Sequence, residues 1–422
     1  MRLVASLCLI AALASPLLAN NWPNWRGPDY NGVASGTGYP TEWSATKNVA
    51  WKVELPGRGS STPVVWGDHI FLTSAADGKN AVLAFSRNGK ELWRVPIGKD
   101  RGGKNPKASG SNPSCVTDGQ HVFAYFRSGD LMCVDFAGKL VWQTNLQDKY
   151  GEDTLWWDLG TSPVLTKQHC VVAVIQSGPS FLVAFDKTTG QTAWKQDRNV
   201  EAPEESAHSY STPVVLNENG HEMLVVLGAD HVTAHDAANG QEVWRVGGLN
   251  PDPASQKRLR SIASAVVSDG IVIAPYQRGQ EITAIKLGGR GDVTKSHVTW
   301  VKKGFGSDVP TPAAVDGKVY VLTDSGKTRG LVTCLDIKTG REIWSGQTEQ
   351  GRKGFSSSPI VVDGKLYATR EDGVTFVLSA GPEFKVLATN ELDNTQTVAT
   401  PVFTDGKILI RTDTHLYCIG GR

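Results

Sequence analysis

The chain has 422 residues, with 43 lysines and arginines against 42 aspartates and glutamates. This near balance excludes the large basic surface that attracts nucleic acid or anionic membranes. The 45 glycines and 13 tryptophans favour a folded, turn-rich β protein over a disordered chain.

The N-terminus has the pattern of an export signal. Arg2 precedes a short apolar run at 3–14, and small residues up to Ala19 offer cleavage positions. The run is too short for a membrane span, and Cys8 lies inside it, where a lipid anchor is not expected. We therefore expect a signal peptide at 1–19 and a secreted or periplasmic mature protein without a membrane span.

A short phrase of serine or threonine, proline and apolar residues recurs eight times along the chain. Its starts are 42 to 52 residues apart, which is typical of a repeat architecture. The proline position is occupied by Pro63, Pro113, Pro163, Pro213, Ala265, Pro312, Pro359 and Pro401.

Each repeat has the pattern of four short strands joined by glycine turns. The segment 311–344 shows it most clearly, because its Asp-Gly and Thr-Gly pairs separate four apolar runs. Four antiparallel strands in 40 to 50 residues are typical of a propeller blade. The sequence thus predicts an all-β, eight-bladed β-propeller of four-stranded antiparallel blades.

The last repeat is one strand short. Only three strands follow Pro401, whereas 48–55 near the N-terminus forms an isolated strand with Trp51 in the position of an outer tryptophan. We expect this N-terminal strand to complete the last blade and close the ring, which removes an exposed sheet edge. The predicted organisation is then an N-terminal extension at 20–47 and a propeller at 48–422.

Six repeats end in tryptophan, and the seventh, at 384–388, does not. In 185–194 we expect Asp186 to accept N–H groups of the turn, Gly190 to adopt a left-handed conformation, and Trp194 to fill the seam between blades. Stacking of a ligand on these tryptophans is the alternative. The predicted docking residues are Trp51, Trp93, Trp142, Asp186, Gly190, Trp194, Asp236, Gly240, Trp244, Trp300, Asp336, Gly340 and Trp344.

The same phrase resembles the tryptophan-docking repeat of pyrroloquinoline-quinone (PQQ) type propellers, Ala-x-Asp-x-x-Thr-Gly-x-x-x-Trp. The closest copy consists of Ala184, Asp186, Thr189, Gly190 and Trp194. Two classes share this fold: PQQ-dependent dehydrogenases, and non-enzymatic propellers such as the outer-membrane assembly factor BamB. Size and pattern are more similar to the second class. The fifth repeat departs from the pattern, because a longer turn occupies 288–297.

The resemblance to quinoprotein dehydrogenases implies a bound quinone, a Ca²⁺ ion and a carboxylate base. Dehydrogenases of this family that oxidise alcohols usually carry adjacent cysteines beside the cofactor, and this chain has no such pair. Asp158, Asp308 and Asp393 are the best-placed acids, and no cluster with Ca²⁺-ligand spacing stands out. We therefore predict no catalytic residues, no metal and no cofactor, with PQQ and calcium required only under the alternative.

The loops before the innermost strands are the best candidates for binding. They converge at one end of the axis and carry cationic and aromatic residues, although a purely structural role for these loops also fits. We expect protein or extended-peptide partners, on this mouth or at a blade edge, and a carbohydrate ligand is a further alternative. The candidate residues are Arg58, Asn112, Trp156, Trp157, His208, Tyr210, Arg260, Asp308 and Arg352.

Cysteines beyond the signal peptide have no paired or metal-binding spacing. Several fall in apolar strand positions, so we expect small buried thiols and not a disulfide framework. These cysteines are Cys115, Cys133, Cys170, Cys334 and Cys418.

Overall fold

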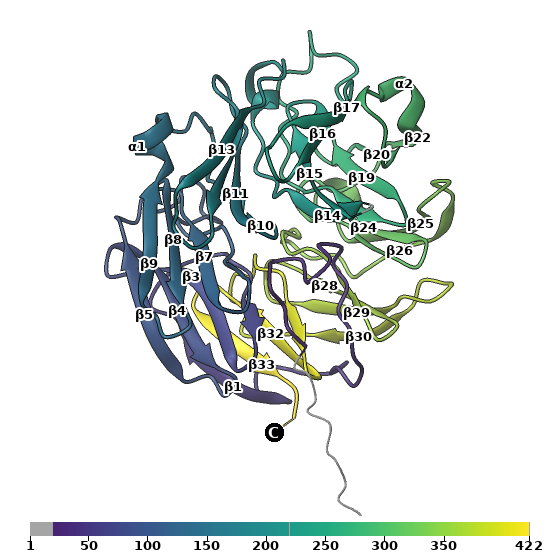
Figure 1. The fold of residues 1–422 in the computed structure, drawn as a ribbon. Helices are drawn as coiled ribbons and strands as arrows, with labels where there is room; N and C mark the ends of the chain where they lie inside the picture. Colours follow the sequence, from purple (N-terminus) through teal and green to yellow (C-terminus); the bar gives the residue numbers. More distant parts are fainter. Residues whose placement is uncertain (1–19, 219, 422) are drawn as a thin grey trace, which may run out of the picture.

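The computed structural model describes residues 20–218 and 220–421, so the predicted signal peptide lies outside the described residues. Eight sheets surround a central axis as the blades of a propeller (Figure 1). Seven have four antiparallel strands, and one has a short fifth strand added. The predicted eight-bladed propeller is thus confirmed. We number the blades 1 to 8 in chain order.

The first four blades are formed by consecutive hairpins. Blade 1 contains β2 (Val64–Trp66), β3 (His69–Ala76), β4 (Lys79–Ser86) and β5 (Glu91–Ile97); blade 2 contains β6 (Val116–Thr117), β7 (His121–Tyr125), β8 (Asp130–Asp135) and β9 (Leu140–Asn145); blade 3 contains β10 (Val164–Leu165), β11 (His169–Val174), β12 (Phe181–Asp186) and β13 (Thr192–Asp197); blade 4 contains β14 (Val214–Glu218), β15 (His221–Gly228), β16 (His231–Asp236) and β17 (Glu242–Val246), with β21 (Gly291–Asp292) at its edge.

The remaining blades follow in the same way, and the short helices of the described residues lie in the connections. Blade 5 contains β18 (Val266–Ser268), β19 (Ile271–Tyr276), β20 (Glu281–Lys286) and β22 (Val298–Lys303); blade 6 contains β23 (Ala313–Val315), β24 (Lys318–Leu322), β25 (Leu331–Asp336) and β26 (Glu342–Gln347); blade 7 contains β27 (Ile360–Val362), β28 (Lys365–Thr369), β29 (Thr375–Ser379) and β30 (Val386–Asn390); blade 8 contains β31 (Val402–Thr404), β32 (Lys407–Arg411), β33 (His415–Ile419) and β1 (Val49–Glu54); the helices are α1 (Leu146–Tyr150), α2 (Thr294–His297), η1 (Glu204–Ala207) and η2 (Gly326–Thr328).

The ring closes where the two ends of the propeller meet. β1 pairs antiparallel with β33, and Trp51 lies opposite Cys418. Strand β1 therefore occupies the outer position of blade 8, as predicted, and the sheet of the last repeat has no missing strand.

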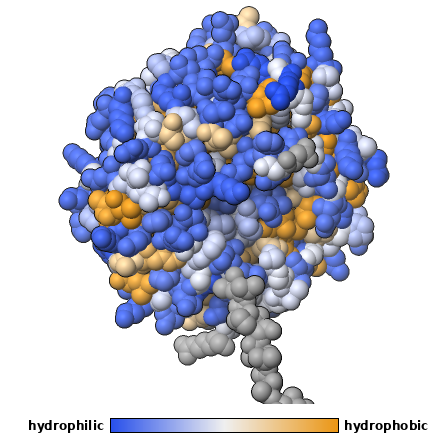
Figure 2. All heavy atoms as spheres, in the orientation of Figure 1, coloured by the Kyte–Doolittle hydropathy of each residue, from blue (hydrophilic) through white to orange (hydrophobic). Residues whose placement is uncertain are grey.

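The core lies between blades and not inside any single one. Val64 and Phe71 of blade 1, for example, belong to the same buried cluster as Val122 and Met132 of blade 2. Inner strands are covered on both faces by neighbouring blades, which explains their continuous apolar runs, whereas outer strands such as β5 have mostly exposed residues. Each blade is thus stabilised by its two neighbours. The apolar side chains that remain exposed form small, scattered groups on the visible face (Figure 2).

The tryptophan phrase joins each blade to the next one. Asp186 accepts hydrogen bonds from the main-chain N–H groups of Thr188 at 3.0 Å and Thr189 at 2.8 Å, which tightens the turn. The indole of Trp142, from the preceding blade, covers Gly190 of this turn and donates from Nε1 to the carbonyl of Lys187 at 2.8 Å. The same packing joins Trp51 to Gly89, Trp93 to Gly138, Trp194 to Gly240 and Trp300 to Gly340.

The longer turn of blade 5 alters the seam with blade 4. Its residues form β21, which pairs in parallel with β17 and places Gly291 opposite Trp244, followed by α2. Trp244 is 1% exposed, and its Nε1 has no hydrogen-bond partner among the described residues. The inserted residues therefore cover this tryptophan instead of offering the usual glycine turn.

Blade 7 lacks the outer tryptophan, and the N-terminal extension compensates. Ala388 occupies the corresponding position of β30, opposite Val377. Trp43 of the extension is buried and stacks on Tyr367 of blade 7 with ring centroids 6.4 Å apart. Its main-chain N–H donates to Asn390 Oδ1 at 2.7 Å, which fixes the extension against β30. The sequence pattern did not reveal this replacement.

All five cysteines of the described residues are buried and unpaired, as expected from their positions in apolar strands. Burial raises the pKa of the Cys418 thiol to about 11, so this group stays protonated at neutral pH. Between residues 20 and 421, leaving aside residue 219, the structure contains no helix that is long and apolar enough to cross a membrane.

Candidate functional site at the mouth of the propeller

A cavity of about 780 Å³ lies at the end of the axis where the chain enters the innermost strands. Its walls come from the connecting loops of all eight blades, and its volume is in the usual range of ligand sites, roughly 300–1,000 Å³. This cavity is at the mouth predicted from the sequence.

The N-terminal extension closes the cavity from below. Trp25 lines the cavity, and the next residue, Arg26, is 1% exposed. The Arg26 guanidinium donates to the carbonyls of Pro312 at 2.6 Å and Pro359 at 3.1 Å, and burial lowers its pKa to about 9, so the group remains charged at neutral pH. The cavity is therefore blind.

Main-chain contacts tie this extension to several blades across the axis. Trp22 forms an antiparallel bridge with Val65 of blade 1, and Val33 forms a parallel bridge with Val361 of blade 7. In Figure 1 the dark purple trace of this segment crosses the ring. The extension is thus an integral part of the propeller floor and not a separate tail.

Eight hydroxyl groups form a closed collar around the axis above this floor. The main-chain N–H of each collar residue donates to the hydroxyl of the collar residue in the following blade, at 2.8–3.1 Å, and blade 8 returns the chain of bonds to blade 1. The collar consists of Thr62, Ser114, Ser162, Thr212, Ser264, Thr311, Ser358 and Thr400.

Trp157 provides a fixed aromatic surface at the mouth. Its Nε1 donates to Glu205 Oε1 at 2.8 Å, and its main-chain N–H donates to the hydroxyl of Tyr210 at 3.0 Å. The side chain is nevertheless 46% exposed. An indole held in this way offers apolar contact area without a large loss of conformational entropy on binding.

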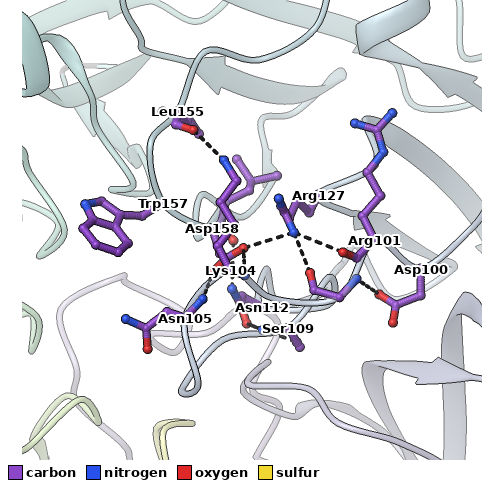
Figure 3. Close-up of polar contacts among 12 residues, drawn as sticks. Asp100, Arg101, Lys104, Asn105, Ser109, Asn112, Arg127, Leu155, Trp157 and Asp158 are labelled. Atoms are coloured by element: carbon purple, nitrogen blue, oxygen red, sulfur yellow. Dashed lines mark hydrogen bonds and ion pairs between the residues drawn. The ribbon is translucent and has the colours of Figure 1, made fainter.

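A buried carboxylate fixes the loops on one side of the cavity (Figure 3). Asp158 accepts from the main-chain N–H of Lys104 at 2.8 Å and of Asn105 at 3.0 Å, and it pairs with Arg127 at 3.2 Å. Lys104 also donates from Nζ to the carbonyl of Leu155 at 2.8 Å. Because every contact of Asp158 holds two loops together, its role in this structure is architectural.

A second ionic group holds the opposite side of the mouth. Arg260 forms a bidentate pair with Asp308 at 2.8 and 2.9 Å and lies 3.5 Å from Glu205. Asp324, which lines the cavity, accepts from the main-chain N–H of Asp308 at 2.8 Å. Burial, with a contribution from the nearby Asp308 charge, raises the pKa of Asp324 to about 6.

Three cationic side chains of the cavity have no carboxylate partner. Arg352 and Lys353 are exposed, and Arg329 donates from Nη1 to the carbonyls of Gly351 at 2.9 Å and Arg352 at 3.1 Å. None of the three forms an ion pair with another described residue. This cationic wall, Arg329, Arg352 and Lys353, is therefore available to an anion.

The sequence-predicted residues are divided between the cavity and its surroundings. Four of them have side chains outside the lining: Arg58 pairs with Asp413, Trp156 packs edge-on against His208, His208 bonds Ser177 at 2.9 Å, and Asp308 supports Arg260. The residues that line the cavity are Asn112, Trp157, Tyr210, Arg260 and Arg352.

Sequence reasoning missed Trp25, Asp324, Arg329 and the collar. The collar could have been noticed, because seven of its members directly precede the repeated proline position. Trp25 and Asp324 reach the cavity through contacts distant in sequence, for which the repeat gives no signal.

The fold family implies a PQQ and Ca²⁺ site, and the residues present do not fit the metal. Calcium needs about six to eight oxygen ligands. The described part of the chain contains no group of three or more His, Cys, Asp or Glu side chains placed to hold a metal ion. Two of the cavity's carboxylates are already paired, Asp158 with Arg127 and Glu371 with Lys107. Among these features, only the cationic wall suits the cofactor, because its positive charges could pair with the carboxylates of PQQ.

Comparison with known proteins agrees with this fold. A curated relative from Yersinia pestis, an outer membrane protein assembly factor BamB, is 23% identical over 357 residues, which cover 83% of this chain and 81% of the relative. Two solved structures are similar in fold. BamB from Moraxella catarrhalis superposes with a TM-score of 0.63 and 14% identity, covering 88% of this chain and 99% of that one.

The second solved structure is a europium-containing methanol dehydrogenase, with a TM-score of 0.71 and 11% identity over 95% of this chain and 98% of the other. Such low identities show the shared fold alone. The sequence profile described as outer membrane protein assembly factor BamB matches residues 29–197, 157–293 and 279–382. Its matches span blades 1 to 6, the first three strands of blade 7 and part of the extension, and they include the tryptophan-docking turns described above. The chain therefore belongs to the BamB family of PQQ-like propellers.

Proposed function

We propose that this protein is an exported, non-catalytic propeller of the cell envelope that binds a protein partner at its mouth. The observation that supports the proposal is the form of the cavity, which is blind and has walls already fixed by buried ionic contacts such as Arg127–Asp158 and Arg260–Asp308. A preformed site binds without the cost of ordering its loops. Membership of a family named for protein assembly agrees with a protein as the partner.

The distribution of charges in the mouth also favours binding over catalysis. Of the three carboxylates that line the cavity, Asp158 and Glu371 are paired with cations, and Asp324 is the one without an ion pair among the described residues. Within the same residues, Arg352 and Lys353 have no carboxylate partner, and the Trp157 indole is exposed. Groups of this kind recognise a ligand, and a general base needs a carboxylate or imidazole free to take a proton.

A photo-cross-linking amino acid at position 353 tests the proposal. In envelope extracts, we expect a discrete protein adduct from position 353 and none from position 341, an exposed residue in a glycine turn outside the cavity. Equal labelling from both positions would contradict a mouth-directed partner.

A quinoprotein oxidoreductase is the second candidate. It is favoured by the similarity in fold to methanol dehydrogenase and by Asp324, a cavity carboxyl whose pKa is raised to about 6. The mature protein should be mixed with PQQ and Ca²⁺ and assayed with alcohols, aldose sugars and a dye acceptor. Saturable dye reduction that disappears when Ca²⁺ is chelated would replace the binding function by the dehydrogenase.

A further inference from the structure

The mouth cavity carries an excess of positive charge that the whole chain does not have. Six cationic and three acidic side chains line the cavity, whereas the complete sequence has a net charge of only +1. The excess comes from Arg329, Arg352 and Lys353, since the cavity's Lys107, Arg260 and Arg278 have carboxylate partners. Asp324, a lining carboxyl without an ion pair among the described residues, offsets part of this excess. Charges inside a concave, low-dielectric site attract counter-charges more strongly than the same charges on an open surface.

The hydroxyl collar has unused donors beside this charge. Each collar hydroxyl accepts one main-chain N–H, and none of the eight donates a hydrogen bond to another described residue. All eight residues are at most 6% exposed, yet seven of them line the cavity. A hydroxyl has one donor and two acceptor sites, so each of these groups keeps a proton for a ligand.

Such a ring of buried donors matches a carboxylate. An ionised carboxylate only accepts hydrogen bonds, so it can bond collar hydroxyls and the cationic wall without leaving an unmatched donor of its own. The combination is specific, because a neutral amide would gain no ion pair from Arg352 or Lys353 and would bring additional N–H donors to a collar that needs acceptors.

The remaining walls indicate what carries the carboxylate. Trp157 offers its fixed, exposed indole, and Trp25 lies at the closed floor, so apolar groups of the ligand have aromatic surfaces on which to pack. Because the floor is closed by the extension, a chain cannot pass through the propeller. The site therefore suits a chain end or the tip of a loop.

We propose that the mouth cavity binds an acidic peptide segment of a partner protein, with carboxylates on the cationic wall and the hydroxyl collar and an apolar side chain against Trp157. This inference rests on the proposed function. It adds the chemistry of the bound segment and the residues that recognise it.

Fluorescence anisotropy with a labelled acidic hexapeptide tests the proposal directly. The peptide contains aspartate and glutamate residues around one phenylalanine, and its control has asparagine and glutamine in their place. We expect saturable binding of the acidic peptide to the mature protein, weaker at higher salt, and at least tenfold weaker binding of the amide control. Equal binding of the two peptides would overturn the proposal.

Two double variants with the same change in net charge locate the site. Arg352→Gln with Lys353→Gln should weaken binding of the acidic peptide ten- to hundredfold, as expected for the loss of charge-assisted hydrogen bonds. Lys338→Gln with Arg341→Gln, in an exposed glycine turn outside the cavity, should leave binding unchanged. Unchanged binding in the first variant, or an equal loss in both, would overturn the assignment to the cavity.

An isosteric pair at Ser162 tests the collar. Asparagine and aspartate can both accept the N–H of Ser114, which now bonds Ser162 Oγ at 2.9 Å, so both variants should keep the ring closed. Only asparagine can also donate to a carboxylate, and aspartate adds a repelling charge. Peptide binding should survive in Ser162→Asn and be lost in Ser162→Asp at similar thermal stability. Binding of equal strength in the two variants would show that the collar does not contact the ligand.

Competition separates the sources of the carboxylate. Oligogalacturonate and PQQ are added to the labelled complex, and the proposal expects neither to displace the peptide at concentrations near the peptide Kd. Displacement at such concentrations would overturn the peptide assignment in favour of an anionic sugar or a small polycarboxylate. The cross-linking amino acid at position 353 already replaces Lys353, so adding Arg352→Gln to it removes both exposed cations of the wall. If the adduct persists in that variant, the scaffold function stands and the acidic-segment inference fails.

Discussion

A pair of glycine substitutions isolates the free energy that tryptophan docking contributes to the propeller. Gly340 and Gly364 have almost the same left-handed backbone, with φ of 68° and 67°. An alanine Cβ at position 364 would meet nothing within 4 Å, whereas at position 340 it would lie 2.6 Å from Cδ2 of Trp300. The two substitutions therefore share the backbone strain and differ in the contact with the indole.

The shared strain is about 1–2 kcal/mol. At Gly340 the indole must also move, which adds about 1–3 kcal/mol for overpacking and weakens the 3.0 Å hydrogen bond from Trp300 Nε1 to the carbonyl of Ile337, worth about 1 kcal/mol. We expect Gly364→Ala to lower the free energy of unfolding by about 1–2 kcal/mol and Gly340→Ala by roughly 2–3 kcal/mol more.

Urea denaturation of the mature protein, followed by far-UV circular dichroism, measures both changes. The control is the Trp300→Ala background, where the indole is absent and Gly340→Ala should cost no more than Gly364→Ala. An excess that persists without the indole would show that the turn, and not the docked tryptophan, is responsible. Equal effects in the wild-type background would refute the docking argument altogether.

Three further outcomes are expected from the same structure. Trp51→Ala should destabilise the protein by about 3–5 kcal/mol, and deletion of 20–54 should do more, because it removes the closing strand and the floor; thermal denaturation compares them. Burial lowers the pKa of His235 to about 4, so neutral His235 contributes fully to stability above about pH 6.5. This contribution, up to about 3 kcal/mol, is lost as the pH falls towards 4, and His235→Gln should flatten this part of the stability profile. The pKa of Asp324 is raised to about 6, so its ionisation destabilises the folded protein progressively between about pH 4 and pH 6, and fully above that. Asp324→Asn should therefore stabilise the protein by about 1–3 kcal/mol at pH 7 but not below about pH 4 in urea titrations.

The eight-bladed architecture was predictable because each repeat contains the strand and turn pattern of a whole blade within about 40 to 50 consecutive residues. Gly190 and Trp194 are read within one strand–turn–strand unit, and the missing fourth strand of the last repeat pointed directly to Trp51. Where a repeat lacks its tryptophan, the sequence pattern did not predict what takes its place. Trp43 replaces the absent tryptophan of blade 7 from a segment 345 residues away from Ala388, and no local pattern links the two.

The candidate site was predictable only in outline. Converging loops indicated the mouth, but the partners of each charge come from different blades. Arg58 looked like a free cation and is paired with Asp413, whereas Arg329, which was not selected, lines the cavity without a carboxylate partner among the described residues. Whether a surface charge is available to a ligand depends on such distant contacts, and sequence spacing does not contain them.

Blade 2 differs from the other blades in the position of its collar residue. Elsewhere the collar residue directly precedes the proline position, which would place Asn112 in the ring. The ring uses Ser114 instead, and Asn112 turns aside to accept from Ser109 and to donate to the carbonyl of Leu159.

The loop of blade 2 therefore bends so that a hydroxyl, and not an amide, completes the circle. Removal of any collar hydroxyl leaves a buried N–H without a partner, at a cost of about 1–3 kcal/mol, so a loss of stability in an alanine variant cannot distinguish a closing role from a binding role. The proton that each hydroxyl retains is the feature that closure does not require. Exchange of asparagine for aspartate at Ser162 changes that feature while an acceptor for the Ser114 N–H remains, and it is therefore the substitution that separates the two roles.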